Sequence, residues 1–349
     1  MKNQYHRSFL MLSAWILAMV STDASAALFC VNTVATLQSA LTTSGTNGQD
    51  DQINIVAGTY SLGAAGLQFG SSEANSLTIF GGYTAGCAQL TSAATKLDGQ
   101  SLQRPLRIIQ NSTSNSASVH VERLTFISGH ASSETGGGLE VVTTNAEVRI
   151  ESSRFLANHA EIASGALFVN TNGLIRLRNN LFFLNDATNI GALQLLTGNS
   201  VAYITGNTFV SNSTATTNGV GAVNVGSTTG THFWFCNNIL WNNNANGGAD
   251  LYASAAVVLR NNDIGVLAGV APDPMSQLNQ NVDPQFASCS GFLCFSFELQ
   301  RASALVDAGD DAPPDGTGSF DLAGKLRRIG AHVDIGAYEQ DVLFRDGFD

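Results

Sequence analysis

Hydrophobic and polar residues alternate with a period of two in short runs between residues 119 and 264, and Asn, Gly, Ser or Thr residues separate the runs. This pattern predicts short β-strands that bury one face. The hydrophobic positions of these runs are Val148, Ile150, Ile175, Leu177, Ile204, Phe233, Phe235, Val257 and Leu259. The intervals between the runs leave no room for crossover helices, so the pattern predicts an all-β chain.

The runs belong to a repeat of about 27 residues. Copies of Phe-x-x-Asn begin at Phe155, Phe182 and Phe209, and copies of Gly-Ala-aliphatic begin at Gly165, Gly191 and Gly221. A constant period of this size is typical of a solenoid, whose repeats stack on their neighbours. Because the repeats contain strands and no helices, we expect a parallel β-helix with coils about 4.8 Å apart.

Aligning the repeats predicts columns of side chains that stack from coil to coil. The inward column contains Phe126, Phe155, Phe182, Phe209, Leu240 and Ile264. Two asparagine columns contain Asn180, Asn207, Asn238 and Asn262, and Asn158, Asn185, Asn212 and Asn243. Asn tolerates left-handed backbone and forms amide ladders, so we expect these residues to occupy the corners of the coils. We expect the glycine of each Gly-Ala-aliphatic unit to mark another corner with a positive φ.

One outward column combines cationic and aromatic side chains, in the order His120, Arg149, Arg176, Tyr203 and Trp234. Stacking and charge-assisted hydrogen bonds suit such a surface to sugars or uronates, so Arg149, Arg176, Tyr203 and Trp234 are the candidate ligand-binding residues. The next column contains Glu122, Glu151, Arg178, Thr205, Cys236 and Arg260, and a weaker third contains Glu140, Phe168, Gln194, Asn224 and Tyr252. The alternative is that these side chains only cover a solvated face, with Glu151 and Arg178 as a cross-strand pair.

Metal-ligating residues are sparse. His130 and His159 lie one coil apart with Asp186 in the next, a pattern open to metal binding, proton transfer or simple exposure at a surface corner. The C-terminal acids are Asp307, Asp310, Asp311, Asp315, Asp321 and Asp334. They lack the spacing of a known calcium loop, so turn capping and pairing with Arg327 or Arg328 is the main interpretation. We therefore predict no metal site and no cofactor, with calcium as the weak alternative.

The beginning of the chain has the pattern of a secretory signal. Residues 1–26 combine a basic start, an apolar segment and the Ala-Ser-Ala cleavage pattern, so we expect a mature chain that begins at Ala27. The apolar segment is too short for a membrane span, and no later segment rivals it. The formal net charge of −11, with few charged residues, argues against a nucleic-acid partner.

Five cysteines in an exported chain suggest disulfides. We expect Cys30–Cys87 at the N-terminal cap and Cys289–Cys294 in a small loop, with Cys236 as a free thiol on a strand, although five cysteines allow other pairings. Residues 33–43 carry apolar residues at helical spacing and predict a short N-terminal capping helix.

The C-terminal sequence carries a family resemblance in the segments 282–286 (Val-Asp-Pro-Gln-Phe), 304–310 (Ala-Leu-Val-Asp-Ala-Gly-Asp) and 333–339 (Val-Asp-Ile-Gly-Ala-Tyr-Glu). These segments resemble the choice-of-anchor Q domain of the pectin-lyase-like class, and the repeats are similar to those of polymorphic outer-membrane proteins. Ser303-Ala304-Leu305 departs from the Ser-Pro-Ala of that family. The resemblance implies a single-stranded right-handed parallel β-helix that is secreted or attached to the outer-membrane surface, and it implies no particular reaction.

The expected organisation has five parts. They are a signal peptide (1–26), an N-terminal cap with irregular coils (27–118), regular coils (119–270), a C-terminal closing segment (271–340) and a tail (341–349). The tail is either a sorting or attachment signal or an ordinary solvated terminus.

The expected function is non-catalytic adhesion or binding of cell-surface or environmental polysaccharide. One alternative is a polysaccharide lyase or glycoside hydrolase that acts on acidic polysaccharide, for which Glu122, Glu140, Glu151, Arg176 and Arg178 are the nearest candidates. Since the sequence brings no two carboxylates together at mid-helix, it assigns no catalytic residue. The other alternative is a purely structural envelope protein. The oligomeric state does not follow from the sequence.

Overall fold

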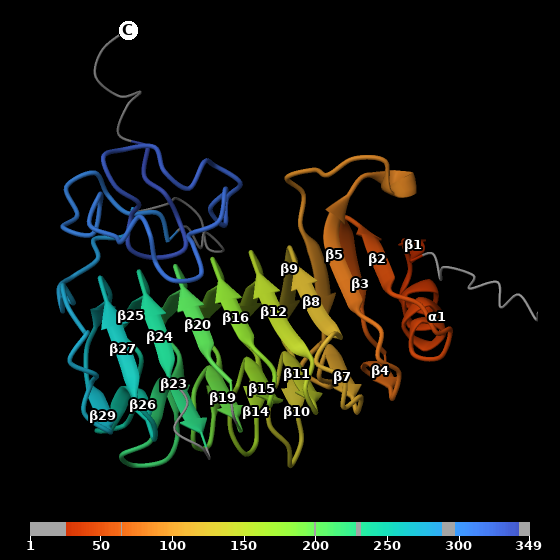
Figure 1. The fold of residues 1–349 in the computed structure, drawn as a ribbon, viewed down its shortest axis with the longest axis horizontal. Helices are drawn as coiled ribbons and strands as arrows, with labels where there is room; N and C mark the ends of the chain where they lie inside the picture. Colours follow the sequence, from red (N-terminus) through yellow and green to blue (C-terminus); the bar gives the residue numbers. More distant parts are fainter. Residues whose placement is uncertain (1–25, 64, 199, 228–231, 288–296, 342–349) are drawn as a thin grey trace, which may run out of the picture.

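The computed structural model describes residues 26–341 except 64, 199, 228–231 and 288–296, and the chain forms a right-handed parallel β-helix (Figure 1). Sheet A contains β1 (Ala27–Val31), β2 (Asp51–Val56), β5 (Leu77–Tyr83), β8 (Ser118–Glu122), β12 (Glu147–Glu151), β16 (Ile175–Arg178), β20 (Ala202–Thr205), β24 (Phe233–Cys236) and β27 (Val257–Arg260). Sheet B contains β3 (Gly58–Ser61), β6 (Thr95–Asp98), β9 (Leu124–Ile127), β13 (Arg154–Leu156), β17 (Leu181–Phe183), β21 (Thr208–Val210), β25 (Ile239–Trp241) and β28 (Asp263–Ile264).

Two further sheets complete the coils. Sheet C contains β4 (Leu67–Ser71), β7 (Leu106–Gln110), β11 (Leu139–Thr143), β15 (Leu167–Thr171), β19 (Leu193–Thr197), β23 (Val220–Ser227), β26 (Ala249–Ala253) and β29 (Leu267–Gly269). The short sheet D contains β10 (His130–Ala131), β14 (His159–Ala160), β18 (Asp186–Ala187) and β22 (Ser213–Thr214). From β2 onward each coil therefore contributes one strand to each long sheet, and β1 adds a further strand to sheet A, which confirms the predicted fold class.

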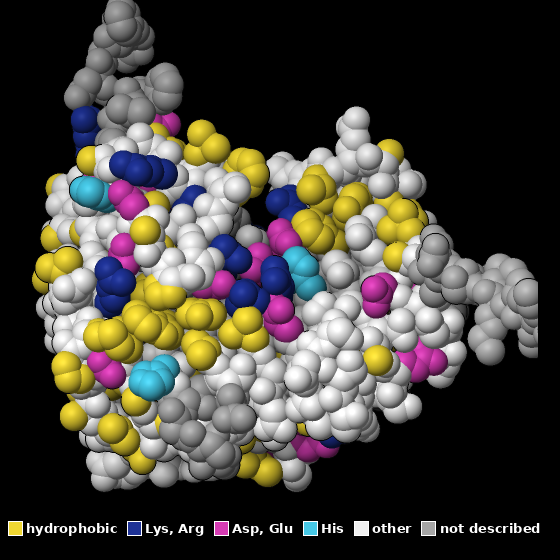
Figure 2. Space-filling model, in the orientation of Figure 1, with side chains coloured by type: hydrophobic (Ala, Val, Ile, Leu, Met, Phe, Trp, Pro, Cys, Tyr) yellow, Lys and Arg dark blue, Asp and Glu magenta, His cyan; other side chains and the backbone are white. Residues whose placement is uncertain are grey.

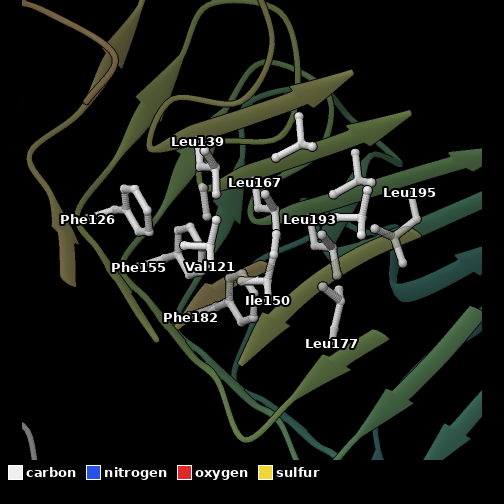
Figure 3. Packing of buried hydrophobic residues seen from close by; sticks show 14 of the residues in the cluster. Val121, Phe126, Leu139, Ile150, Phe155, Leu167, Leu177, Phe182, Leu193 and Leu195 are labelled. Carbon is white, nitrogen blue, oxygen red and sulfur yellow. The ribbon is translucent and has the colours of Figure 1, made fainter. Parts of the chain in front are cut away.

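The predicted inward column forms the core. Phe155 pairs in register with Phe126 and Phe182, and Phe182 pairs with Phe209. Their rings stack with centroids 4.9, 4.8 and 4.4 Å apart, and aliphatic side chains from the other sheets pack against them (Figure 3). Because identical residues repeat on successive coils, the interior is a continuous apolar rod.

Both predicted asparagine columns form buried amide ladders. Asn207 shows the pattern, since its Nδ2 donates to the carbonyl of Leu177 and to Oδ1 of Asn238, while its own Oδ1 accepts from the backbone N–H and Nδ2 of Asn180. The ladder asparagines themselves do not adopt the left-handed backbone. The residue before each one does, as at Asn179 (φ 54°) and Gly206 (φ 64°), so the predicted backbone of the ladder positions was wrong by one residue.

The glycine of each Gly-Ala-aliphatic unit is required for a different reason from the one predicted. Gly165, Gly191 and Gly221 have no positive φ. Instead, a Cβ on Gly191 would lie 2.1 Å from the carbonyl oxygen of Gly221, and one on Gly165 would lie 2.4 Å from that of Gly191. The coils approach each other too closely here for any side chain, so glycine is required by space rather than by backbone conformation.

The N-terminal end is closed by α1 (Val34–Ser44), as predicted. Thr33 caps this helix through a reciprocal capping box with Thr36. The predicted Cys30–Cys87 disulfide is present and ties β1 to the short helix η1 (Ala85–Cys87). Cys236 is free and buried, as expected, whereas the predicted Cys289–Cys294 pair lies outside the described residues.

The described part of the segment 297–341, here called the C-terminal block, folds back over the corner between sheets A and B (Figure 1). Side-chain amides of Asn179, Asn237 and Asn261 donate to backbone carbonyls of the block. The loop between β5 and β6, here called the N-terminal excursion (residues 84–94), projects from the same side of the helix (Figure 1). The two segments therefore lie on the same side of the helix, with a space between them above the middle coils (Figure 1).

Candidate functional site

A cavity of about 300 Å³ lies between the N-terminal excursion and the C-terminal block. Figure 2 shows the surface hollowed at this place, with charged side chains gathered beside the hollow. Thr91 contributes from the excursion and Leu322 from the block. Arg123 and Ser152 contribute from the corners that join sheet A to sheet B, and Arg154 contributes from the start of β13. The cavity therefore begins where β8 and β12 end.

The outer face of sheet A next to the cavity holds a network of charged side chains. Glu147 pairs with Arg149 at 2.5 Å and also with Arg176, whose Nε donates to Asp315 of the C-terminal block at 2.5 Å. Partial burial alone would lower the pKa of Arg176, but its contacts with Asp315 and Glu147 outweigh burial and raise it. Both arginines predicted to bind a ligand thus already have carboxylate partners.

The neighbouring outward column brings two carboxylates together beside a histidine of the first column. Glu122 and Glu151 pair in register on adjacent strands, and His120 lies two residues before Glu122 on β8. One ligand atom from each of the three lies within 4.8 Å of the others, and this is the one such group of three or more among the described residues. Arg178 donates to Glu151 at 2.7 Å, which confirms the predicted cross-strand ion pair. The donor set of one imidazole and two carboxylates suits a divalent cation or proton transfer.

The aromatic half of the predicted stripe lies farther along sheet A. Tyr203 on β20 pairs in register with Arg176 and with Trp234 on β24, and both aromatic side chains are partly exposed. Hydrophobic side chains gather on this part of the face, beside the charged group (Figure 2). The structure therefore places the four candidate residues Arg149, Arg176, Tyr203 and Trp234 in one outward column on consecutive strands.

Other candidates lie away from the cavity. His130 and His159 pair in register on sheet D, where His159 bonds to Asp186 at 2.7 Å and His130 faces Glu161. Glu140 lies on sheet C between Arg104 and Arg107. Neither set belongs to the cavity.

The C-terminal acids mostly stabilise the turns of the block. Asp321, Asp334 and Asp307 accept backbone N–H groups, and Asp311 pairs with Arg328. Arg327 pairs with Glu339 in a fully buried site. Turn capping and arginine pairing, the main interpretation of these acids, is therefore confirmed for these residues.

Sequence reasoning missed Arg123, Arg154, Glu147 and Asp315 as parts of the site. Arg123 carried a usable signal, because it occupies the left-handed corner position that holds Ser, Asn or Gly in later coils (φ 58°). A long cationic side chain at such a position is unusual. Asp315 carried no such signal, because it meets Arg176 across 139 residues of irregular sequence.

Comparisons of this chain with protein-family models, curated proteins and solved structures gave no match. None of the described helices has the length and apolar character needed to cross a membrane.

Proposed function

We propose that this protein binds an extended polysaccharide along the outer face of sheet A without cleaving it. The observation that carries the proposal is the column in which Tyr203 and Trp234 continue the line of Arg149 and Arg176 away from the cavity. Aromatic faces on adjacent strands offer a stacking surface for sugar rings, and the surrounding polar side chains offer hydrogen bonds. A sheet face that repeats its outward side chains from coil to coil suits a long ligand better than a compact one.

Binding is tested with the chain from Ala27 against immobilised neutral and acidic polysaccharides. Tyr203→Ala and Trp234→Ala should each weaken retention about tenfold, as expected for the loss of about 1.4 kcal/mol of stacking. Tyr252→Ala is the matched control, because Tyr252 is an outward aromatic residue of sheet C. Unchanged retention in both sheet A variants would exclude this stripe as the binding surface.

The second candidate is a polysaccharide lyase or glycoside hydrolase, favoured by the juxtaposed Glu122, Glu151 and His120. Paired carboxylates about 5 Å apart are the arrangement that retaining glycosidases use. Release of reducing ends or unsaturated uronates in the binding assay, abolished by Glu151→Gln, would establish catalysis. If neither binding nor product appears, the purely structural role in the envelope is favoured.

We further propose that the protein is exported and belongs to the choice-of-anchor Q group. The Cys30–Cys87 disulfide supports an oxidising compartment. Cleavage after Ala26 would also leave β1 intact, since this strand begins at Ala27, whose N–H donates to the carbonyl of Asp50. N-terminal sequencing of the secreted chain tests this, and a mature start within β1 would contradict it.

A further inference from the structure

The arginines of the cavity differ from the arginines of the sheet A face. Arg149, Arg176 and Arg178 each lie within 4.0 Å of a carboxylate. In the described part of the chain no carboxylate lies within that distance of Arg123 or Arg154, although both line the same cavity. Positive charge is therefore left uncompensated in the cavity and compensated on the face beside it.

The contacts of the two guanidinium groups hold them in place without using all their donors. Nη2 of Arg123 donates to the carbonyl of Thr91 at 2.7 Å, and Nη2 of Arg154 donates to the carbonyl of Leu322 at 2.9 Å. Nε of Arg123 is buried and has no hydrogen-bond partner. Since a guanidinium group has five N–H donors, both side chains retain donors for a further acceptor.

Among the described residues, the one carboxylate that lines the cavity is Asp321, and its oxygens accept hydrogen bonds from backbone N–H groups. Asp321 is buried and accepts the backbone N–H groups of Lys325 and Glu339 at 2.7 and 2.9 Å. Its bonds hold the turn of the C-terminal block that forms one wall. It therefore shapes the cavity, the cations beside it are Arg327 and Lys325, and it forms no ion pair with Arg123 or Arg154.

We propose that this cavity is a recognition site for a sugar residue that carries an anionic group, a carboxylate or a sulfate. The inference rests on the proposed polysaccharide binding and names its specificity. A guanidinium group binds both anions through paired charge-assisted hydrogen bonds. A cavity of about 300 Å³ is at the small end of ligand sites, which suits one sugar residue of a chain whose remainder lies along sheet A.

The experiment measures the affinity of the chain from Ala27 for trigalacturonate, its methyl ester and a sulfated trisaccharide by calorimetry. The unmodified protein should bind at least one anionic ligand about 10- to 100-fold more tightly than the methyl ester. This comparison needs no variant and therefore does not depend on how a substitution affects folding. Preference for the uronate or for the sulfated sugar identifies the source of the anion.

The variants Arg123→Gln and Arg154→Gln should remove most of that preference. Arg328→Gln is the matched control, because it makes the same change at an exposed arginine of the C-terminal block. Equal affinity for charged and methylated ligands, or an undiminished preference in both cavity variants, would overturn the inference while leaving polysaccharide binding intact. If charge-dependent binding persists in Tyr203→Ala and Trp234→Ala, the proposal that these two residues bind the polysaccharide is contradicted, and the inference about the cavity stands. Absence of any binding would overturn both.

Discussion

Single residues stabilise this molecule by bonding to equivalent residues on the neighbouring coils, and the asparagine ladder is the most direct example. Asn207 is fully buried and is bonded to the coil before it and the coil after it. Asn207→Ala removes the acceptor of the backbone N–H of Asn180 and the donor to the carbonyl of Leu177. Since a buried unsatisfied polar group costs about 1–3 kcal/mol, we expect the free energy of unfolding to fall by about 2–5 kcal/mol in urea titrations. Asn170→Ala, at an exposed position, should change it little, and equal losses would contradict the ladder argument.

Asp263 makes stability depend on pH. It is buried on β28, its Oδ1 accepts from the N–H of Val282, and its Oδ2 has no hydrogen-bond partner. Burial raises the pKa of Asp263 to about 6, and nearby Asp250 and Asp283 add to the effect. Because the folded state keeps this proton up to about pH 6 while the unfolded chain loses it near pH 4, stability falls as the pH rises between these values.

The contribution of Asp263 to this fall is about 3 kcal/mol at most and is complete above about pH 6. Asp263→Asn should reduce the slope of the unfolding free energy between pH 4 and 6 and raise stability at pH 7, while Glu339, whose pKa burial raises to about 8, keeps its own contribution to the slope. Asp98→Asn is the control, because Asp98 likewise accepts one backbone N–H, from Gln100, and lies on β6 of the same sheet B. A profile as steep in Asp263→Asn as in the unmodified protein would show that another group titrates.

The residue scale also shows where sequence reasoning ends. The Phe and Asn columns were predictable because a fixed spacing places equivalent residues on the same face of every coil. The reason for each residue was harder to predict. Glycine at position 191 is compatible with a positive φ or with a close approach, and only the position of the Gly221 carbonyl decides between them.

At the scale of elements, the N-terminal cap depends on a covalent link. The Cys30–Cys87 disulfide joins β1 to η1 across a sequence separation of 57 residues. A loop of this length gives about 4 kcal/mol of stabilisation from chain entropy. Cys30→Ser with Cys87→Ser should therefore loosen β1, α1 and β2 while the middle coils keep their protection, because a solenoid is stabilised between neighbours.

Amide hydrogen exchange distinguishes local unfolding of the N-terminal cap from unfolding of the whole chain. Exchange in β1 and α1 should accelerate strongly in the double variant, and exchange in β20 should not. A Cys289→Ser, Cys294→Ser variant serves as a control for the removal of two cysteines. Uniform acceleration along the chain would contradict a cap that unfolds independently.

At the scale of the whole molecule, the C-terminal block covers outward side chains at the end of the sheet A strands and so determines which of them are exposed to solvent. Cys236 belongs to an outward column, in register with Thr205 and Arg260, yet its side chain is fully buried. Asp310 of the block bonds to the adjacent Asn237 and pairs with Arg260. Irregular contacts of this kind join distant segments without any period, which explains why the sequence predicted the coils but neither the cover nor the cavity beside it.

Cys236 is consequently a reporter for detachment of the block. Burial raises the pKa of its thiol to about 12, so the thiol should react very slowly with a disulfide reagent in a Cys289→Ser, Cys294→Ser background. Arg327→Ala leaves Glu339 unpaired in a buried site, which typically costs about 3–5 kcal/mol. If the block detaches as a unit, the labelling rate of Cys236 should rise about 100-fold or more.

The control is Arg328→Ala, which changes the neighbouring, exposed arginine and should leave the labelling rate of Cys236 unchanged. An equally slow rate in Arg327→Ala would show that the block stays in place without this ion pair, held by its other contacts with the coils, such as those of Asn179, Arg176 and Arg260.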